Sequence, residues 1–130
     1  MRAAMMLLVG LMMGALGTSF ALNTLRQAHA LPRGLMTVIN HHHRSVKTEL
    51  AAADCSPAEL RDHFVLLGVL GSDIDSAFSM PHDAVFTRYA SDFRAATAAA
   101  LAIPDAACSA LAPAATRIND TCNACHRDYR

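Results

Sequence analysis

From residue 31 onward, apolar residues recur every three or four positions, and no stretch shows the sustained alternation of a β-strand. This is the period of amphipathic helices, so the pattern predicts an all-α fold. Prolines and turn residues divide the pattern into four segments. Four amphipathic helices joined by short connections favour an antiparallel four-helix bundle.

The first predicted helix begins at Pro32, because proline is well tolerated in the first helical turn. The second begins with a capping box, in which Ser56 is the N-cap, Pro57 lies in the first turn and Glu59 follows. Gly68 weakens this second helix, as does Gly71. The apolar stripe of the first helix consists of Leu35, Ile39, Val46 and Leu50, with His42 or His43 between them. That of the second helix consists of Leu60, Phe64, Leu67, Leu70, Ile74 and Phe78.

The third predicted helix follows Pro81 and ends at Pro104. The fourth has apolar steps of four and three, as in the seam of a coiled coil. Pro113 either starts this fourth helix or kinks it. The apolar stripe of the third helix consists of Phe86, Tyr89, Phe93, Ala96 and Ala100. That of the fourth helix consists of Leu111, Ala115, Ile118, Cys122 and Cys125.

The N-terminal segment has the pattern of a secretory signal peptide. Arg2 precedes an uncharged apolar stretch at residues 5–17, which is shorter than the roughly twenty residues of a membrane span. Small residues fit cleavage after Ala21, or later after Ala30. We therefore expect a signal peptide at residues 1–21, a helical domain at residues 22–130 and a periplasmic location. A retained membrane anchor is the alternative; with cleavage, no membrane association is expected.

Charge adds little to this picture. Eleven Lys and Arg balance eleven Asp and Glu, and Lys47 is the single lysine. No basic patch suggests a nucleic-acid partner, and a docking ring of lysines is excluded. No Ser/His/Asp or paired-carboxylate arrangement stands out, so we do not expect an enzyme.

The most informative motif is Cys122-Asn123-Ala124-Cys125-His126 near the end of the chain. Cys-x-x-Cys-His is the attachment signature of c-type haem. Two thiols three residues apart on a helix can reach the vinyl groups at one edge of the porphyrin. The adjacent imidazole then serves as the axial ligand of the iron. The motif predicts one covalent haem c held by Cys122, Cys125 and His126.

Two other uses of Cys-x-x-Cys are weaker candidates. A zinc site needs a second pair of ligands, and the nearest candidates are His41, His42 and His43, far upstream and without a cysteine. Three consecutive helical positions spread over about 200° and cannot all face one ion. A thioredoxin-like pair needs a preceding strand, which the pattern does not show.

The string TCNACHRDYR, the segment LPRGLMTVINHHH and the four-helix pattern resemble the cytochrome c′ family, over essentially the whole chain after the signal. The resemblance implies a haem near the end of the last helix, with Met36 on the distal side and Arg130 near the proximal imidazole. Where the family usually has Arg, four residues before Met36, this chain has Pro32, with Arg33 one place later. The resemblance also leaves a homodimer open.

The sixth iron ligand decides the chemistry. Met36, Met80 and His82 all come from parts of the chain that share one end of the predicted bundle. If Met36 binds the iron, the site is six-coordinate and suits electron transfer with unidentified redox partner proteins. If Met36 only covers the iron, the five-coordinate site suits binding of NO or CO.

A second pair of cysteines, Cys55 and Cys108, lies outside the motif. In an exported protein such a pair suggests a disulfide. Cys55 precedes the second predicted helix and Cys108 follows the third, so both belong at the end of the bundle opposite the haem. The alternative is two buried free thiols.

Overall fold

The computed structural model describes residues 2–78, 80, 83–104 and 107–129, and within these residues it contains six helices and no strand. The predicted all-α fold is confirmed. The helices are α1 (Arg2–Ala28), α2 (Ala30–Ala51), α3 (Pro57–Ser72), α4 (Ile74–Phe78), α5 (Ala84–Leu101) and α6 (Cys108–Asp128).

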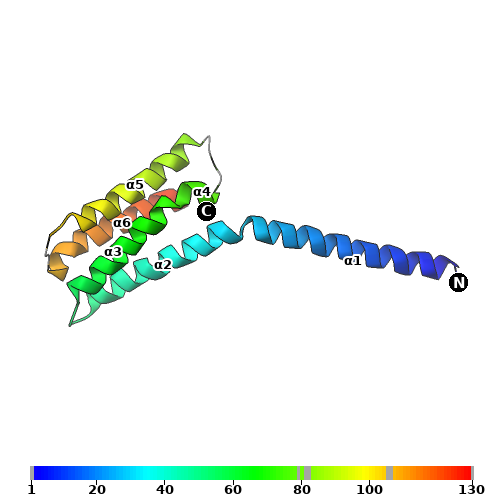
Figure 1. The fold of residues 1–130 in the computed structure, drawn as a ribbon, viewed down its shortest axis with the longest axis horizontal. Helices are drawn as coiled ribbons and strands as arrows, with labels where there is room; N and C mark the ends of the chain where they lie inside the picture. Colours follow the sequence, from blue (N-terminus) through cyan, green and yellow to red (C-terminus); the bar gives the residue numbers. More distant parts are fainter. Residues whose placement is uncertain (1, 79, 81–82, 105–106, 130) are drawn as a thin grey trace.

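Helix α1 projects away from the other helices and adjoins only the start of α2 (Figure 1). Its large apolar side chains are exposed, among them Met6 and Phe20. The helix continues beyond the apolar stretch at residues 5–17, and the segment Arg2–Gln27 is long and apolar enough to cross a membrane. A signal sequence near the N-terminus has the same properties.

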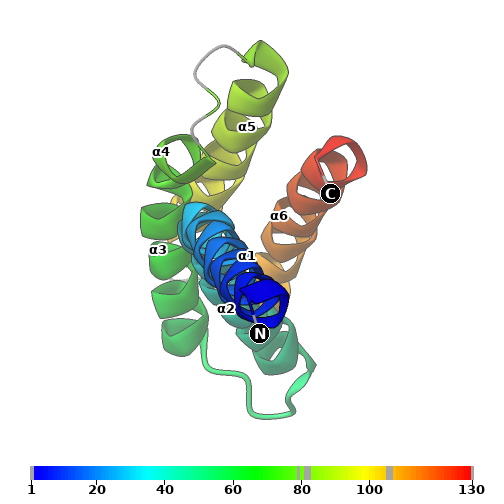
Figure 2. The ribbon, with the colours of Figure 1, turned by 90° about the vertical axis from the view of Figure 1, so that its right-hand side faces the viewer.

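The remaining helices pack around one core. Helix α2 packs against α3, α3 against α5, α5 against α6, and α6 contacts α2. Figure 2 shows α3 and α4 on one side of α2 and α6 on the other. The start of α2, the short helix α4, the start of α5 and the end of α6 lie together at one end (Figure 1).

The core consists largely of the predicted stripes. Thr97 is the one polar residue in the described part of the chain that is buried with them. Leu50, Leu70 and Phe78 are only partly buried against the core. The buried apolar residues are Leu35, Ile39, Val46, Leu60, Phe64, Leu67, Ile74, Ala77, Phe86, Ala90, Phe93, Ala96, Ala100, Leu111, Ala115 and Ile118.

Helix boundaries differ from the predicted ones in three places. Helix α2 begins two residues before Pro32. The second predicted helix is divided at Asp73, whose N–H donates to Leu70 O at 3.2 Å while its carbonyl accepts from Ala77 N at 2.9 Å. Pro113 lies inside α6, which begins at Cys108. The periodic pattern continues through all three places, so it does not reveal them.

The predicted N-cap of α3 is confirmed, because Ser56 Oγ accepts a hydrogen bond of 3.4 Å from Glu59 N. Gly71 has a role that its low helix propensity does not indicate. A Cβ at this position would lie 2.9 Å from Cε1 of Phe93, closer than carbon atoms normally approach. The glycine therefore allows α3 and α5 to pack closely at the ring of Phe93.

The predicted disulfide lies at the end of the helices that is far from the start of α2. Cys55 and Cys108 are bonded, with a sequence separation of 53 residues. Nearby, Arg61 of α3 donates hydrogen bonds to Leu101 O at 2.9 Å and Ile103 O at 3.1 Å. These bonds satisfy one carbonyl in the last residue of α5 and one in the connection that follows it.

Candidate functional site

The motif residues Cys122, Cys125 and His126 share one face of α6. At about 100° per residue, Cys122 and His126 point in nearly the same direction, and Cys125 lies about 60° from Cys122. Cys122 is partly buried against the hydrophobic core. Cys125 is also partly buried, whereas His126 is exposed. The face therefore passes from the core at Cys122 to the surface at His126.

Both thiols of the motif are free, unlike those of Cys55 and Cys108. Burial, with a smaller contribution from neighbouring Cys125, raises the pKa of Cys122 to about 11. Burial and then the charge of Asp128 also raise the pKa of Cys125. Reactive thiols of redox pairs instead have lowered pKa values. These two thiols are protonated at neutral pH, which does not favour a thioredoxin-like role.

A hydrogen bond from a tyrosine joins the end of α6 to the start of α5. Tyr129 Oη donates a hydrogen bond of 2.6 Å to Asp83 Oδ2. The other carboxylate oxygen of Asp83 accepts bonds from Val85 N at 3.0 Å and Phe86 N at 2.9 Å, and so caps α5. The hydrogen bond from Tyr129, followed by that from Phe86 N, lowers the pKa of Asp83. The bond to Asp83 raises the pKa of Tyr129 to about 12.

Aromatic rings pack near the hydrogen bond between Tyr129 and Asp83. The ring of Phe86 lies 5.3 Å from that of Phe78 and 5.3 Å from that of Tyr129, between ring centroids. Tyr89 lies 6.2 Å from Tyr129 and donates a hydrogen bond of 2.7 Å to Asp128 Oδ2. These contacts hold Tyr129, three positions after His126, against α5.

Sequence reasoning did not identify Asp83 as part of the site. A signal was present, because aspartate directly before an amphipathic segment is a typical N-cap. Its second role, as acceptor for Tyr129 Oη, depends on a contact across 46 positions. Local patterns do not encode such a contact.

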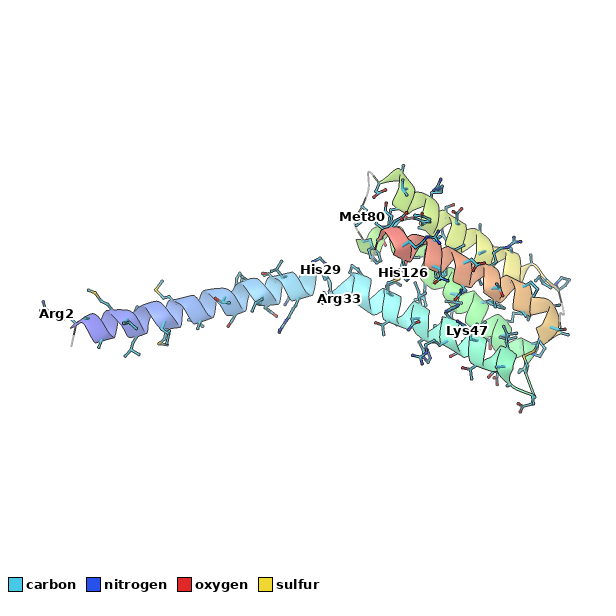
Figure 3. The ribbon with its side chains drawn as sticks, turned by 180° about the vertical axis from the view of Figure 1, so that it is seen from behind. Arg2, His29, Arg33, Lys47, Met80 and His126 are labelled. Atoms are coloured by element: carbon cyan, nitrogen blue, oxygen red, sulfur yellow. A yellow bond between two sulfur atoms is a disulfide. The ribbon has the colours of Figure 1, made fainter. Side chains whose placement is uncertain are left out.

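The candidates for the sixth iron ligand differ in how far they are buried. Met36 is partly buried against the same core as Cys122. Met80 is 40% exposed in the connection between α4 and α5. Figure 3 shows Met80, His126 and Arg33 toward the end from which α1 leaves, with Lys47 toward the other end. His82 and Arg130 lie outside the described residues, so their predicted roles stay predictions.

The three consecutive histidines at positions 41–43 differ in their surroundings. His41 is exposed, but both His42 and His43 are half-buried. His42 contacts His63 of α3, with 3.1 Å between the two Nδ1 atoms. Nε2 of His43 is buried without a hydrogen-bond partner among the described residues. Burial, followed by the charge of Lys47, lowers the pKa of His43.

A surface hollow of about 440 Å³ lies beside the histidines and not beside the Cys-x-x-Cys-His motif. In the described part of the chain, no three His, Cys, Asp or Glu side chains come close enough together to hold a metal ion among them. The hollow is lined by Thr37, Asn40, His41, Arg44, Ser45, Thr48, Glu49 and His63.

The donor set near the end of α6 fits attachment of haem c. It offers two free, neutral thiols three residues apart and an exposed imidazole on the same helix face. His126 makes no hydrogen bond to another described residue that would compete for its ring nitrogens. No protein-family model, curated protein or solved structure matches the chain.

Proposed function

We propose that this chain is an exported c-type cytochrome that carries electrons through one covalently bound haem, in an antiparallel four-helix bundle of the cytochrome c′ kind. The observation that carries the proposal is the set Cys122, Cys125 and His126 on one face of α6, with both thiols free. The disulfide between Cys55 and Cys108 agrees with an exported protein.

In this proposal each residue of the motif has a distinct task. Cys122 and Cys125 would hold the haem through thioether bonds, and His126 would provide a nitrogen ligand for the iron. The haem supplies reversible one-electron chemistry when bound. The partial burial of Cys122 supports a position in which the attached edge of the macrocycle meets the core.

Tyr129 and Asp83 would keep this attachment site in place. Their hydrogen bond joins the end of α6 to the start of α5, and the ring of Phe86 packs against that of Tyr129. Arg130, four positions after His126, would add a positive charge near the proximal side. Such a charge disfavours the oxidised iron and raises the reduction potential.

Met36 decides between electron transfer and the second candidate function. A thioether ligand opposite His126 would raise the potential and complete the coordination that suits an electron carrier. Met36 is, however, already packed against the hydrophobic core. This packing favours the alternative in which the thioether stays in the core, and an open distal face then binds NO or CO.

Export would follow from α1 acting as a signal sequence. Its exposed apolar side chains make no core of their own, which supports removal after Ala21 or Ala30 rather than a role in the folded domain. Mass spectrometry of the periplasmic protein would give the new N-terminus. Recovery of the intact chain in the membrane fraction would instead indicate a retained anchor.

The test of the function is an absorption spectrum of the purified protein, oxidised and reduced, with and without CO. A haem stain that persists on a denaturing gel and disappears in the Cys122→Ser/Cys125→Ser variant supports covalent attachment. A low-spin spectrum that CO does not change supports electron transfer, and a high-spin spectrum that CO changes supports gas binding. Absence of the stain, with zinc released by a chelator, would overturn the proposal.

A further inference from the structure

His42 of α2 and His63 of α3 meet at the contact between these two helices, in a place that the Cys-x-x-Cys-His motif does not use. Their Nδ1 atoms are 3.1 Å apart, and their ring centroids are 5.3 Å apart. Both residues are half-buried. Two imidazole nitrogens this close share either a proton, which one ring donates to the other, or a cation bound by both lone pairs.

The separation of the nitrogens suits a shared metal ion. Bonds from histidine nitrogen to a first-row metal such as zinc are about 2.0–2.1 Å long. Two such bonds hold their nitrogens about 2.9 Å apart at a right angle and about 3.4 Å apart at a tetrahedral angle. The observed 3.1 Å lies between these values. The distance between the two nitrogens therefore matches that of two ligands of one ion.

The protonation of His42 also suits a ligand. Burial, followed by the charges of His63 and His41, lowers the pKa of His42. The uncharged imidazole is the form that binds metals, and a lowered pKa favours that form. Since the ring is held at a helix contact, little side-chain freedom remains to be lost when an ion binds.

The hollow beside the pair provides access. His63 lines it, together with His41 and Asn40. A hydrated ion can approach His63 from this side, and water can fill its remaining coordination positions. Arg44 and Glu49 also line the hollow, so one positive and one negative side chain offset each other there.

We propose that His42 and His63 form a two-histidine binding site for a divalent transition-metal ion, separate from the haem site. Among such ions, sites with nitrogen ligands generally bind Cu²⁺ most tightly. Cu²⁺ is therefore the ion that we expect the site to bind most tightly. The site does not depend on the proposed function, because neither histidine belongs to the Cys-x-x-Cys-His motif.

The test is a titration of the purified full-length chain with Cu²⁺ alone, after alkylation of every thiol that is free. We expect one tightly bound Cu²⁺ per chain, with imidazole nitrogen couplings in its electron paramagnetic resonance spectrum. The His42→Gln and His63→Gln variants should each bind Cu²⁺ about tenfold or more weakly, since even the indirect partners of metal-binding histidines contribute about 10-fold to 100-fold.

The His41→Gln variant is the matched control, because it removes a neighbouring histidine and keeps the pair. It should retain a copper signal with two nitrogen couplings. Circular dichroism checks that each variant keeps its helices. Unchanged affinity in both His42→Gln and His63→Gln would overturn the proposal. If the variants do not fold, a wild-type copper spectrum without nitrogen couplings would overturn it as well.

Discussion

The hydroxyl of Tyr129 lies 2.6 Å from Oδ2 of Asp83, and this single bond joins the end of α6 to the N-cap of α5. The same carboxylate holds two backbone N–H groups of α5 through its other oxygen. One aspartate thus connects the helix that carries the candidate haem ligands with the helix beside it.

Removal of the Tyr129 hydroxyl should destabilise the protein. We expect the Tyr129→Phe variant to unfold at a lower urea concentration, because it loses a hydrogen bond to a charged acceptor and keeps the ring. Tyr89→Phe is the matched control, since Tyr89 also bonds an aspartate, Asp128, but caps no helix with it. Equal losses in the two variants would contradict the special role assigned to Asp83.

The contribution of this bond should depend on pH at both ends of the range. The pKa of Asp83 is lowered from 3.8, so its stabilisation is present above that value and is lost as the pH falls through the folded pKa. The pKa of Tyr129 is raised from 10.0 to about 12, so its stabilisation is present below 10 and is lost as the pH rises toward 12.

Denaturation of wild type and Tyr129→Phe across the pH range measures this dependence. The difference in unfolding free energy should be largest between the two ordinary pKa values, 3.8 and 10.0. It should shrink toward zero in strong acid and in strong base. A difference that stays constant from acid to alkali would show that the hydroxyl acts through packing alone.

The two glycines of α3 should respond to alanine in opposite directions. At Gly68 the nearest atom to a new Cβ would be Thr97 Oγ1 at 3.8 Å, an ordinary contact. Gly68→Ala should therefore stabilise by about 0.5–1 kcal/mol through helix propensity. At Gly71 the ring of Phe93 must move, which costs about 1–3 kcal/mol and exceeds that gain. Chemical denaturation measures both, and a stabilised Gly71→Ala variant would contradict the close packing of α3 on α5.

The Cys55–Cys108 disulfide should contribute substantially to stability. Closure of a loop of this length contributes about 4 kcal/mol on the chain-entropy model. The Cys55→Ala/Cys108→Ala variant should show a loss of that order in its unfolding free energy. Alkylation followed by peptide mapping of the unreduced protein should leave both residues unmodified. Labelling at either one would show that they are free thiols.

Met36→Leu should distinguish the two roles proposed for Met36. Leucine keeps most of the apolar volume and removes the sulfur, so a ligating Met36 predicts a change from a low-spin to a high-spin spectrum. Met80→Leu is the control, because Met80 is exposed and lies at the same end. An unchanged spectrum in Met36→Leu would support the alternative in which Met36 only covers the iron.

The sequence predicted the features that depend on local periodicity. The stripes containing Leu60, Phe64 and Ile118 are buried as expected, and Ser56 caps its helix. The break at Asp73 was not predicted, because the apolar spacing continues unchanged into α4. The motif itself was evident from the sequence.

The surroundings of the motif were not evident from the sequence. The bond from Tyr129 to Asp83 and the contact of His42 with His63 each join separate helices. The disulfide is also a long-range contact, but cysteines are few and topology placed both at one end. Side chains that occur more often offer no such constraint, so their partners emerge only from the packed structure.

Both ends of α6 are thus tied to other parts of the protein, by the disulfide of Cys108 at its first residue and by the hydrogen bond of Tyr129 directly after its last. Local fluctuations normally begin by fraying at helix termini. Here a cross-link tethers each terminus of α6, so fraying at either end should be restricted. The hydrogen-bonded backbone amides of α6 should accordingly exchange with solvent more slowly than those of a helix with free ends.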